Sequence, residues 1–206
     1  EYFRVLQSAA FCFPDGVGLR MAGKMLSRQI THNVNGTDMF PLLCAALEES
    51  DAGVFLFGGQ PGVVEQTRDW IELHYPGVRV CGVRHGYFSP EEEPLVVRQI
   101  AHSGARLLLV ALGAPVQDVW IHRHLPELGV SVAMGVGGLF DFYSGRIPRA
   151  PLWVRSRGGE WLYRLYQEPR RMWRRYVVGN PLFLLRVVRE RLRGGGQKAD
   201  THRWSS

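Results

Sequence analysis

The sequence has few cysteines and no long apolar run, and each scarcity excludes a class of protein. Its 206 residues include three cysteines, Cys12, Cys44 and Cys81, which lie far apart among apolar neighbours. An odd number of cysteines without CxxC spacing does not form a disulfide framework, so we expect small core residues in a reducing compartment. No signal peptide and no run of 18 apolar residues occurs, and the sequence therefore predicts no transmembrane helix. Because the chain begins at Glu1 rather than Met, we expect its natural N-terminus to be missing.

The common motifs of nucleotide and metal chemistry are also missing. The chain has no P-loop, no GxSxG elbow and no GxGxxG fingerprint, since the stretch GVGGLF at 135–140 lacks the last glycine. Its seven histidines show no HxxxH or HExxH spacing, and no DxD pair is present to hold Mg²⁺. We expect no metal and no cofactor, so a bound diphosphate must be balanced by backbone amides and arginines. Only His85, beside a glycine loop, is a candidate for a functional histidine, against the commoner structural role.

Positive charge is distributed unevenly along the chain. The net charge is +6, yet residues 1–145 contain 10 lysines and arginines against 15 acidic residues, whereas residues 146–193 contain 13 arginines against 3 glutamates. A segregated arginine-rich segment is typical of contact with phosphate groups in nucleic acid, in a membrane surface or in a diphosphate ligand. The alternative is a solvated basic helix.

Apolar runs alternate with helical patterns over most of the chain. Runs at 54–57, 78–81, 107–112 and 130–134 predict strands, and a shorter run at 11–13 predicts a fifth. Helical spacing covers residues 2–10, 17–27, 39–49, 63–75, 91–103 and 120–125, with Thr37 or Asp38 placed to cap the third of these. Continuous apolar strands separated by helices indicate an α/β fold with a mostly parallel sheet covered on both faces. Each strand ends in a glycine-bearing loop, so right-handed crossovers place five loops, and one site, at the same edge.

Two of these loops carry candidate chemistry. Asp15 follows the run at 11–13 in the turn Pro14-Asp15-Gly16, where it is a candidate site acid or an Asp that merely stabilises its turn. The strand at 54–57 runs into Gly58-Gly59-Gln60-Pro61-Gly62 and then a helix. This order lets backbone N–H groups approach a phosphate at a helix N-terminus, although many α/β loops contain paired glycines.

The chain changes character after about residue 145. Helical segments at 161–167, 171–176 and 182–192 combine tryptophan, tyrosine and arginine with an apolar side, and breaks are expected at Glu168-Pro169 and Asn180-Pro181. Such segments are typical of helices that bind a membrane surface, and they are equally typical of helices that pack on the rest of the protein. The sequence thus predicts a domain over 1–145, an arginine-rich helical appendage over 146–193 and a disordered tail over 194–206.

Seven short blocks, in order, resemble the bacterial WecG/TagA/CpsF family of glycosyltransferases. The blocks cover about residues 2–178 and are PDG at 14–16, NGTD at 35–38, FLFGGQPG at 55–62, GYF at 86–88, LGAPVQD at 112–118, GVGGLFD at 135–141 and RAP at 149–151 with EWLYRL at 160–165. The resemblance implies an inverting, metal-independent enzyme that moves a sugar from a UDP-sugar to an undecaprenyl-diphosphate-linked acceptor in cell-surface polysaccharide synthesis. It also implies a cytoplasmic protein, peripheral at the plasma membrane, whose appendage contacts the anionic lipid surface.

The resemblance also assigns roles to individual residues. Asp15 matches the general base, which deprotonates the acceptor hydroxyl and must be an ionised carboxylate within hydrogen-bond reach of it. The donor-binding positions implied are Gly16, Thr37, Asp38, Gly58, Gly59, Gln60, Gly86, Tyr87, Gly113, Pro115, Gln117, Gly137, Gly138 and Asp141. The positions implied to hold the diphosphates of donor or acceptor are Arg149, Arg164, Arg171, Arg174 and Arg175.

The sequence departs from the family pattern at a few positions. Asn33 stands where the family has Arg, Val116 and Asp118 flank the family's glutamine in place of Lys and Glu, and no upstream Thr/Asn-bearing loop is present. Two alternatives therefore stay open, a non-enzymatic nucleotide- or anion-binding module and a truncated inactive paralogue. Nucleic acid is not an expected partner, because the α/β part is acidic. A homo-oligomer is compatible with the sequence.

Overall fold

A computed structural model of the chain describes residues 2–28, 30, 34–151, 153–154 and 159–193. Contacts divide the chain into two compact units. The first combines Glu1–Cys12 with Asn35–Arg149, and the second combines Phe13–Val34 with the chain from Ala150 onward. The predicted tail at 194–206 lies outside the described residues.

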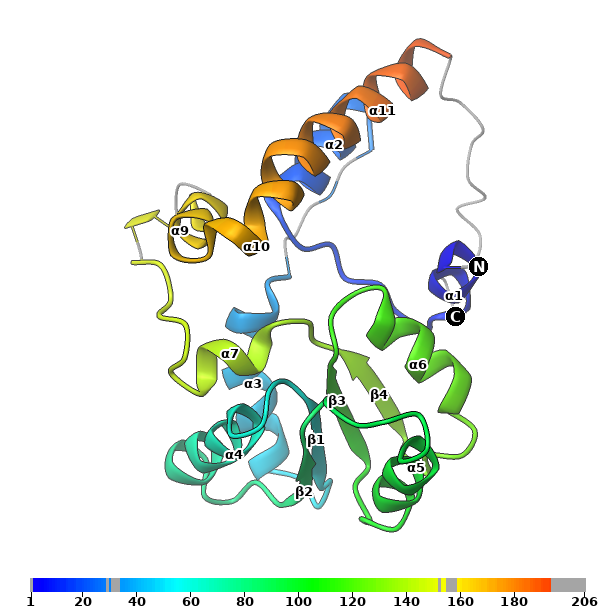
Figure 1. The fold of residues 1–206 in the computed structure, drawn as a ribbon, viewed down its shortest axis with the longest axis vertical. Coiled ribbons are helices and arrows are strands. Elements are labelled where there is room, and N and C mark those ends of the chain that lie inside the picture. The colour runs from blue at the N-terminus through cyan, green and yellow to red at the C-terminus, as the bar shows by residue number, and fades with distance from the viewer. Residues whose placement is uncertain (1, 29, 31–33, 152, 155–158, 194–206) are drawn as a thin grey trace. The chain divides into compact units, whose positions relative to one another are not determined.

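The first unit is built on a parallel sheet with strand order β2-β1-β3-β4 (Figure 1). The strands are β1 (Val54–Gly58), β2 (Val80–Arg84), β3 (Leu107–Ala111) and β4 (Val132–Gly135). Every residue of β1 and of β3 is buried, as expected for central strands covered on both faces. The predicted α/β fold is confirmed.

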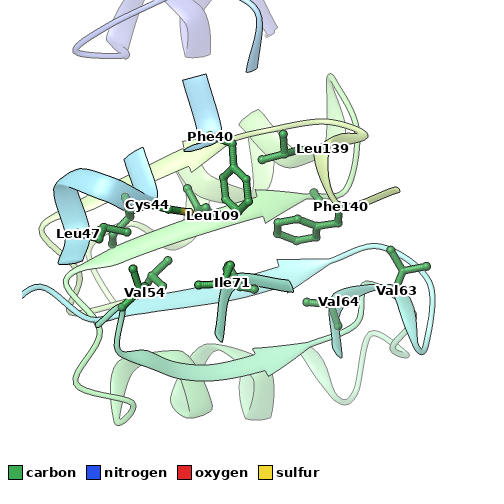
Figure 2. Packing of buried hydrophobic residues seen from close by; sticks show 14 residues of the cluster. Phe40, Cys44, Leu47, Val54, Val63, Val64, Ile71, Leu109, Leu139 and Phe140 are labelled. Atoms are coloured by element: carbon green, nitrogen blue, oxygen red, sulfur yellow. The ribbon is translucent and has the colours of Figure 1, made fainter. Parts of the chain in front are cut away.

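Helices cover both faces of this sheet. On one face lie α3 (Gly36–Glu48), α4 (Val63–His74) and α7 (Leu139–Tyr143), which contribute Phe40, Ile71 and Phe140 to a core with the inward side chains of β1 and β3 (Figure 2). On the other face lie α5 (Glu93–Ala101) and α6 (Val116–His124), whose Ile100 and Trp120 pack with Phe57. A first helix, α1 (Tyr2–Ser8), contacts α6.

Several local predictions were wrong, and Cys12, which was expected in the core, is exposed. The run at 11–13 forms no strand, and Phe11 and Phe13 are 72% and 52% exposed, so the described residues form a four-stranded sheet with four loops at its carboxyl edge. Asn35, rather than Thr37 or Asp38, caps α3, because its side-chain oxygen accepts the Thr37 N–H at 2.9 Å. Helix α6 also begins at Val116 rather than near residue 120.

The second unit is helical. It contains α2 (Val17–Met25), α9 (Glu160–Gln167), α10 (Pro169–Trp173), a π-helical segment η1 (Arg174–Gly179) and α11 (Asn180–Leu192). Helix α2 packs along α11, where a Cβ on Gly18 would lie 3.9 Å from the Phe183 ring. The expected break at Asn180-Pro181 is wrong, since Pro181 occupies the first turn of α11, where a missing N–H costs little. None of the helices in the described part of the chain is both long and apolar enough to cross a membrane.

Candidate functional site

The strand order places a topological switch point between β1 and β3. From β1 the chain crosses through α4 to β2, and from β3 it crosses through α6 to β4 on the other side. The chain therefore leaves these two neighbouring strands toward opposite sides of the sheet, and ligands of open α/β sheets bind at such a switch point beyond the carboxyl ends of the strands.

Glycines hold the loops of this edge close together. Gly58 has a φ of 120°, and a Cβ there would lie 2.5 Å from the carbonyl of Ala111. This approach lets the Gly59 N–H donate to the Ala111 carbonyl at 2.9 Å, and the Gly86 N–H donate to the Gly59 carbonyl at 2.9 Å. Backbone bonds thus join the loops after β1, β2 and β3, which makes this edge a fixed platform.

Gln117, in the first turn of α6, joins the loop after β3 to the loop after β4. Its side-chain Oε1 accepts the N–H of Gly113 at 3.2 Å and the N–H of Gly137 at 2.9 Å. These two donors fix which end of the carboxamide is oxygen. The residue is 6% exposed, no described residue accepts a hydrogen bond from Nε2, and a Cβ on Gly135, the last residue of β4, would lie 2.5 Å from that nitrogen. Gln117 therefore keeps its N–H donors at the carboxyl end of β4, beside the two loops that its oxygen joins.

The N-terminus of α3 lies at the same edge, because α3 runs antiparallel to β1, which it precedes. Thr37 is 6% exposed and its hydroxyl donates to Asn35 Oδ1 at 2.6 Å. Arg149 Nη2 donates to Thr37 Oγ1 at 2.9 Å and to Asp38 Oδ1 at 2.5 Å. The predicted donor residues Thr37 and Asp38 and the predicted phosphate residue Arg149 are thus brought together, with the Arg149 charge facing a carboxylate.

Sequence reasoning missed Tyr143, which completes this group. Its hydroxyl donates to the Thr37 carbonyl at 2.5 Å, and burial raises the pKa of Tyr143 to about 12, so the hydroxyl keeps its proton at physiological pH. Pro41 in α3 is the signal that could have revealed this partner. A proline lacks the N–H that would bond the carbonyl four residues earlier, which here is that of Thr37.

Other predicted donor-site residues lie around the platform. Asp141, 8% exposed in α7, forms an ion pair with Arg146 at 2.8 Å. Tyr87 is 62% exposed, and its backbone N–H donates to His85 Nδ1 at 3.3 Å. Gln60 is exposed in the loop after β1, whereas Pro115 and Gly138 precede α6 and α7 as their N-caps. Within the described ranges, no group of three or more His, Cys, Asp and Glu side chains is arranged to hold a metal ion.

The remaining predicted residues belong to the second unit. Asp15 is exposed and Gly16, with a φ of 101°, is the N-cap of α2. The Arg174 guanidinium lies 5.5 Å from the centroid of the Trp173 ring, a cation–π distance. The side chains of Arg164, Arg171 and Arg175 lie outside the described residues. The roles expected for these residues stay predictions.

Comparison with known proteins gives one family. Residues 1–197 match the sequence model described as "Glycosyl transferase WecG/TagA/CpsF family". The chain is 33% identical over 190 residues to the N-acetylglucosaminyldiphosphoundecaprenol N-acetyl-beta-D-mannosaminyltransferase of Bacillus subtilis (strain 168), a match that covers 92% of this chain and 73% of the relative. A protein of the same name from Bacillus spizizenii is 34% identical over 189 residues, covering 92% and 72% of the two chains.

Proposed function

This chain belongs to the WecG/TagA/CpsF family of glycosyltransferases, and we propose that it transfers a sugar from a UDP-sugar to a polyprenyl-diphosphate-linked acceptor. The relatives named above transfer N-acetylmannosamine to N-acetylglucosaminyldiphosphoundecaprenol. By extension, the donor of this protein is a UDP-linked N-acetylhexosamine and the acceptor is a lipid-linked amino sugar, in the synthesis of a cell-surface polymer.

The orientation of Gln117 is the observation that best supports a donor site at the switch point. Because its oxygen is held by two glycine N–H groups, the amide nitrogen keeps its N–H donors for a ligand at the carboxyl edge of the sheet, next to Gly135. Phosphate and uracil oxygens are acceptors, so a UDP group complements this nitrogen. The glycine loops after β1 and β3 add backbone that a diphosphate can approach closely.

The proposed reaction is a single displacement with inversion at the anomeric carbon. Asp15 takes the proton of the acceptor hydroxyl, and the hydroxyl oxygen forms a bond to the anomeric carbon. The bond from that carbon to the diphosphate oxygen breaks, and UDP leaves with the bonding electrons. Hydrogen-bond donors at the platform, Gln117 among them, stabilise the charge that develops on the diphosphate.

The second unit is proposed to meet the lipid-linked acceptor. Arg164, Arg171, Arg174 and Arg175 are assigned to its diphosphate, because arginine forks match phosphate oxygens. Apolar side chains remain exposed on both α9 and α11, among them Trp161, Tyr166, Leu182 and Leu185. Exposed apolar and arginine side chains on one helix are what an anionic membrane surface binds.

Replacing Gln117 with Glu tests the donor site without removing the loop contacts. In Gln117→Glu, one carboxylate oxygen still accepts the N–H groups of Gly113 and Gly137, while the other replaces the N–H donors of Nε2 with negative charge. We expect the Kd for UDP to rise about 10- to 100-fold, since hydrogen bonds to charged groups contribute about 1.5–3 kcal/mol. Isothermal titration calorimetry with UDP measures this change.

Gln99 provides the matched control for this experiment. It is exposed in the last turn of α5, far along the helix from the carboxyl edge of the sheet, so Gln99→Glu makes the same chemical change away from the switch point and should leave the Kd for UDP unchanged. Equal affinity of Gln117→Glu and the wild-type protein for UDP would exclude Gln117 from the donor site.

A further inference from the structure

The first turn of α3 is tied to the chain segment that follows the last glycine loop. We define the α3 clamp as Thr37 and Asp38 on α3 together with Tyr143 and Arg149. We propose that Tyr143 and Arg149 are positioning residues, which hold Thr37 in the geometry that donor binding requires. The proposal rests on the proposed function, since it takes Thr37 to line the donor site.

Tyr143 supplies a hydrogen bond that α3 cannot make for itself. In a helix the carbonyl of Thr37 would accept the N–H of residue 41, but that residue is Pro41. The Tyr143 hydroxyl takes its place at 2.5 Å. The Tyr143 ring is fixed by its neighbours, with centroids 4.6 Å from Phe40 and 4.4 Å from Trp70. A buried carbonyl left without a donor is unfavourable, so Tyr143 determines whether this turn stays helical.

Arg149 fixes the Thr37 side chain. The Thr37 hydroxyl proton is used by Asn35 Oδ1, and one hydroxyl lone pair accepts from Arg149. The hydroxyl therefore keeps one free lone pair and acts toward a ligand as an acceptor only. Arg149 is held in turn by Asp38, which balances the charge of the guanidinium. The Arg149–Asp38 pair thus sets which ligand groups Thr37 can recognise: hydroxyl or N–H donors.

The α3 clamp also connects Thr37 with Gln117 and the loops at the carboxyl edge of the sheet. Tyr143 ends α7, the short helix that begins directly after Gly137-Gly138, and the Gly137 N–H donates to Gln117. Helix α7 also contacts α4, where the Thr67 hydroxyl shares its proton between the Val63 carbonyl at 2.9 Å and the Phe140 carbonyl at 3.2 Å. The chain re-enters the first unit at Asn35 and leaves it again at Arg149, so the same hydrogen bonds join the point of re-entry, the exit point and the glycine loop.

Tyr143→Phe tests the proposal by removing one hydroxyl from a ring that stays in place. We expect the Kd for UDP to rise about three- to tenfold, the range of one hydrogen bond, with the KM for the lipid-linked acceptor unchanged. Amide hydrogen exchange over residues 35–40 should become faster. Tyr75→Phe is the matched control, because Tyr75 packs on the same Trp70 at 5.7 Å and its hydroxyl bonds to no described residue; it should change neither quantity.

A second substitution provides a rescue. Pro41→Ala restores an N–H that can bond the Thr37 carbonyl within the helix, so Tyr143→Phe should have a smaller effect on exchange and on UDP binding in that background. Faster exchange at 35–40 with unchanged UDP affinity would reduce the clamp to a structural contact and overturn the positioning role. Unchanged exchange would show that there is no clamp. If the wild-type protein itself failed to bind UDP, the proposed function would be wrong, and the exchange measurement would still decide whether the clamp exists.

Discussion

Asp15→Asn is expected to reduce the rate of sugar transfer about 10²- to 10⁴-fold while leaving the Kd for the UDP-sugar unchanged. General bases contribute rate factors of this size, and an amide cannot take the proton of the acceptor hydroxyl. Asparagine has nearly the same shape as aspartate, so the turn before α2 should persist. Turnover with a lipid-linked acceptor gives kcat, and calorimetry with the UDP-sugar gives the Kd.

Asp51→Asn is the control for this prediction. Asp51 is likewise an exposed carboxylate, but it precedes β1 and therefore lies at the opposite edge of the sheet from the platform. Its replacement should leave kcat unchanged. Turnover of Asp15→Asn at the wild-type rate would show that Asp15 is not the general base. It would not contradict the proposed donor site.

Gly58→Ala is expected to destabilise the fold by about 3–5 kcal/mol, from backbone strain and steric overlap together. The φ of 120° at Gly58 is one that residues with a side chain rarely adopt. An added Cβ would also lie 2.5 Å from the backbone of Ala111, which belongs to the neighbouring central strand and cannot move aside. Urea denaturation of the variant and of the wild-type protein measures the difference in unfolding free energy.

A substitution at Gly62 distinguishes backbone strain from steric overlap as the cause of this destabilisation. It lies in the same loop with a φ of 86°, but nothing lies within 4 Å of a Cβ placed there. Gly62→Ala should therefore cost only about 1–2 kcal/mol, the penalty for a left-handed backbone. If the two substitutions had equal effects, the close approach of β1 and β3 would not be what requires glycine at residue 58.

The sheet and its platform could be predicted because they follow from short-range patterns. The apolar runs at 54–57 and 107–112 were long enough to identify β1 and β3, and both strands proved fully buried. Parallel strands with right-handed crossovers end at one edge whatever the details of packing. The glycines of the loops after them, such as Gly58 and Gly113, were therefore expected at that edge.

The run at 11–13 shows where the same reasoning fails. Three apolar residues predict a strand only if a neighbouring strand accepts them, and Phe11 and Phe13 remain exposed. The hydrogen bonds of the α3 clamp also could not be predicted from the sequence, since Tyr143 and Arg149 are 106 and 112 residues from Thr37 along the chain. Pro41 indicates that a carbonyl lacks its helical donor, but it does not say which distant side chain provides one.

The assignment of roles depends on the family blocks more than on periodicity. No pattern of charge or spacing distinguishes Gln117 from other glutamines, and only its block, LGAPVQD, marked it as a site residue. The structure adds a physical reason to consider Gln117 a site residue, since the N–H groups of two loops donate hydrogen bonds to its side-chain oxygen. For Asp15 the block still supplies the role, and the exposed carboxylate before α2 is compatible with it.

Sugar transfer from UDP-N-acetylhexosamines to a polyprenyl-diphosphate-linked N-acetylglucosamine tests the central claim most directly. The acceptor is incubated with the protein and each UDP-sugar in turn, and the lipid-linked product is identified by mass spectrometry. We predict a product extended by one sugar with one donor of the panel, whose binding also raises the Tm of the protein by mass action. Absence of a product with every donor, together with an unchanged Tm, would contradict the account.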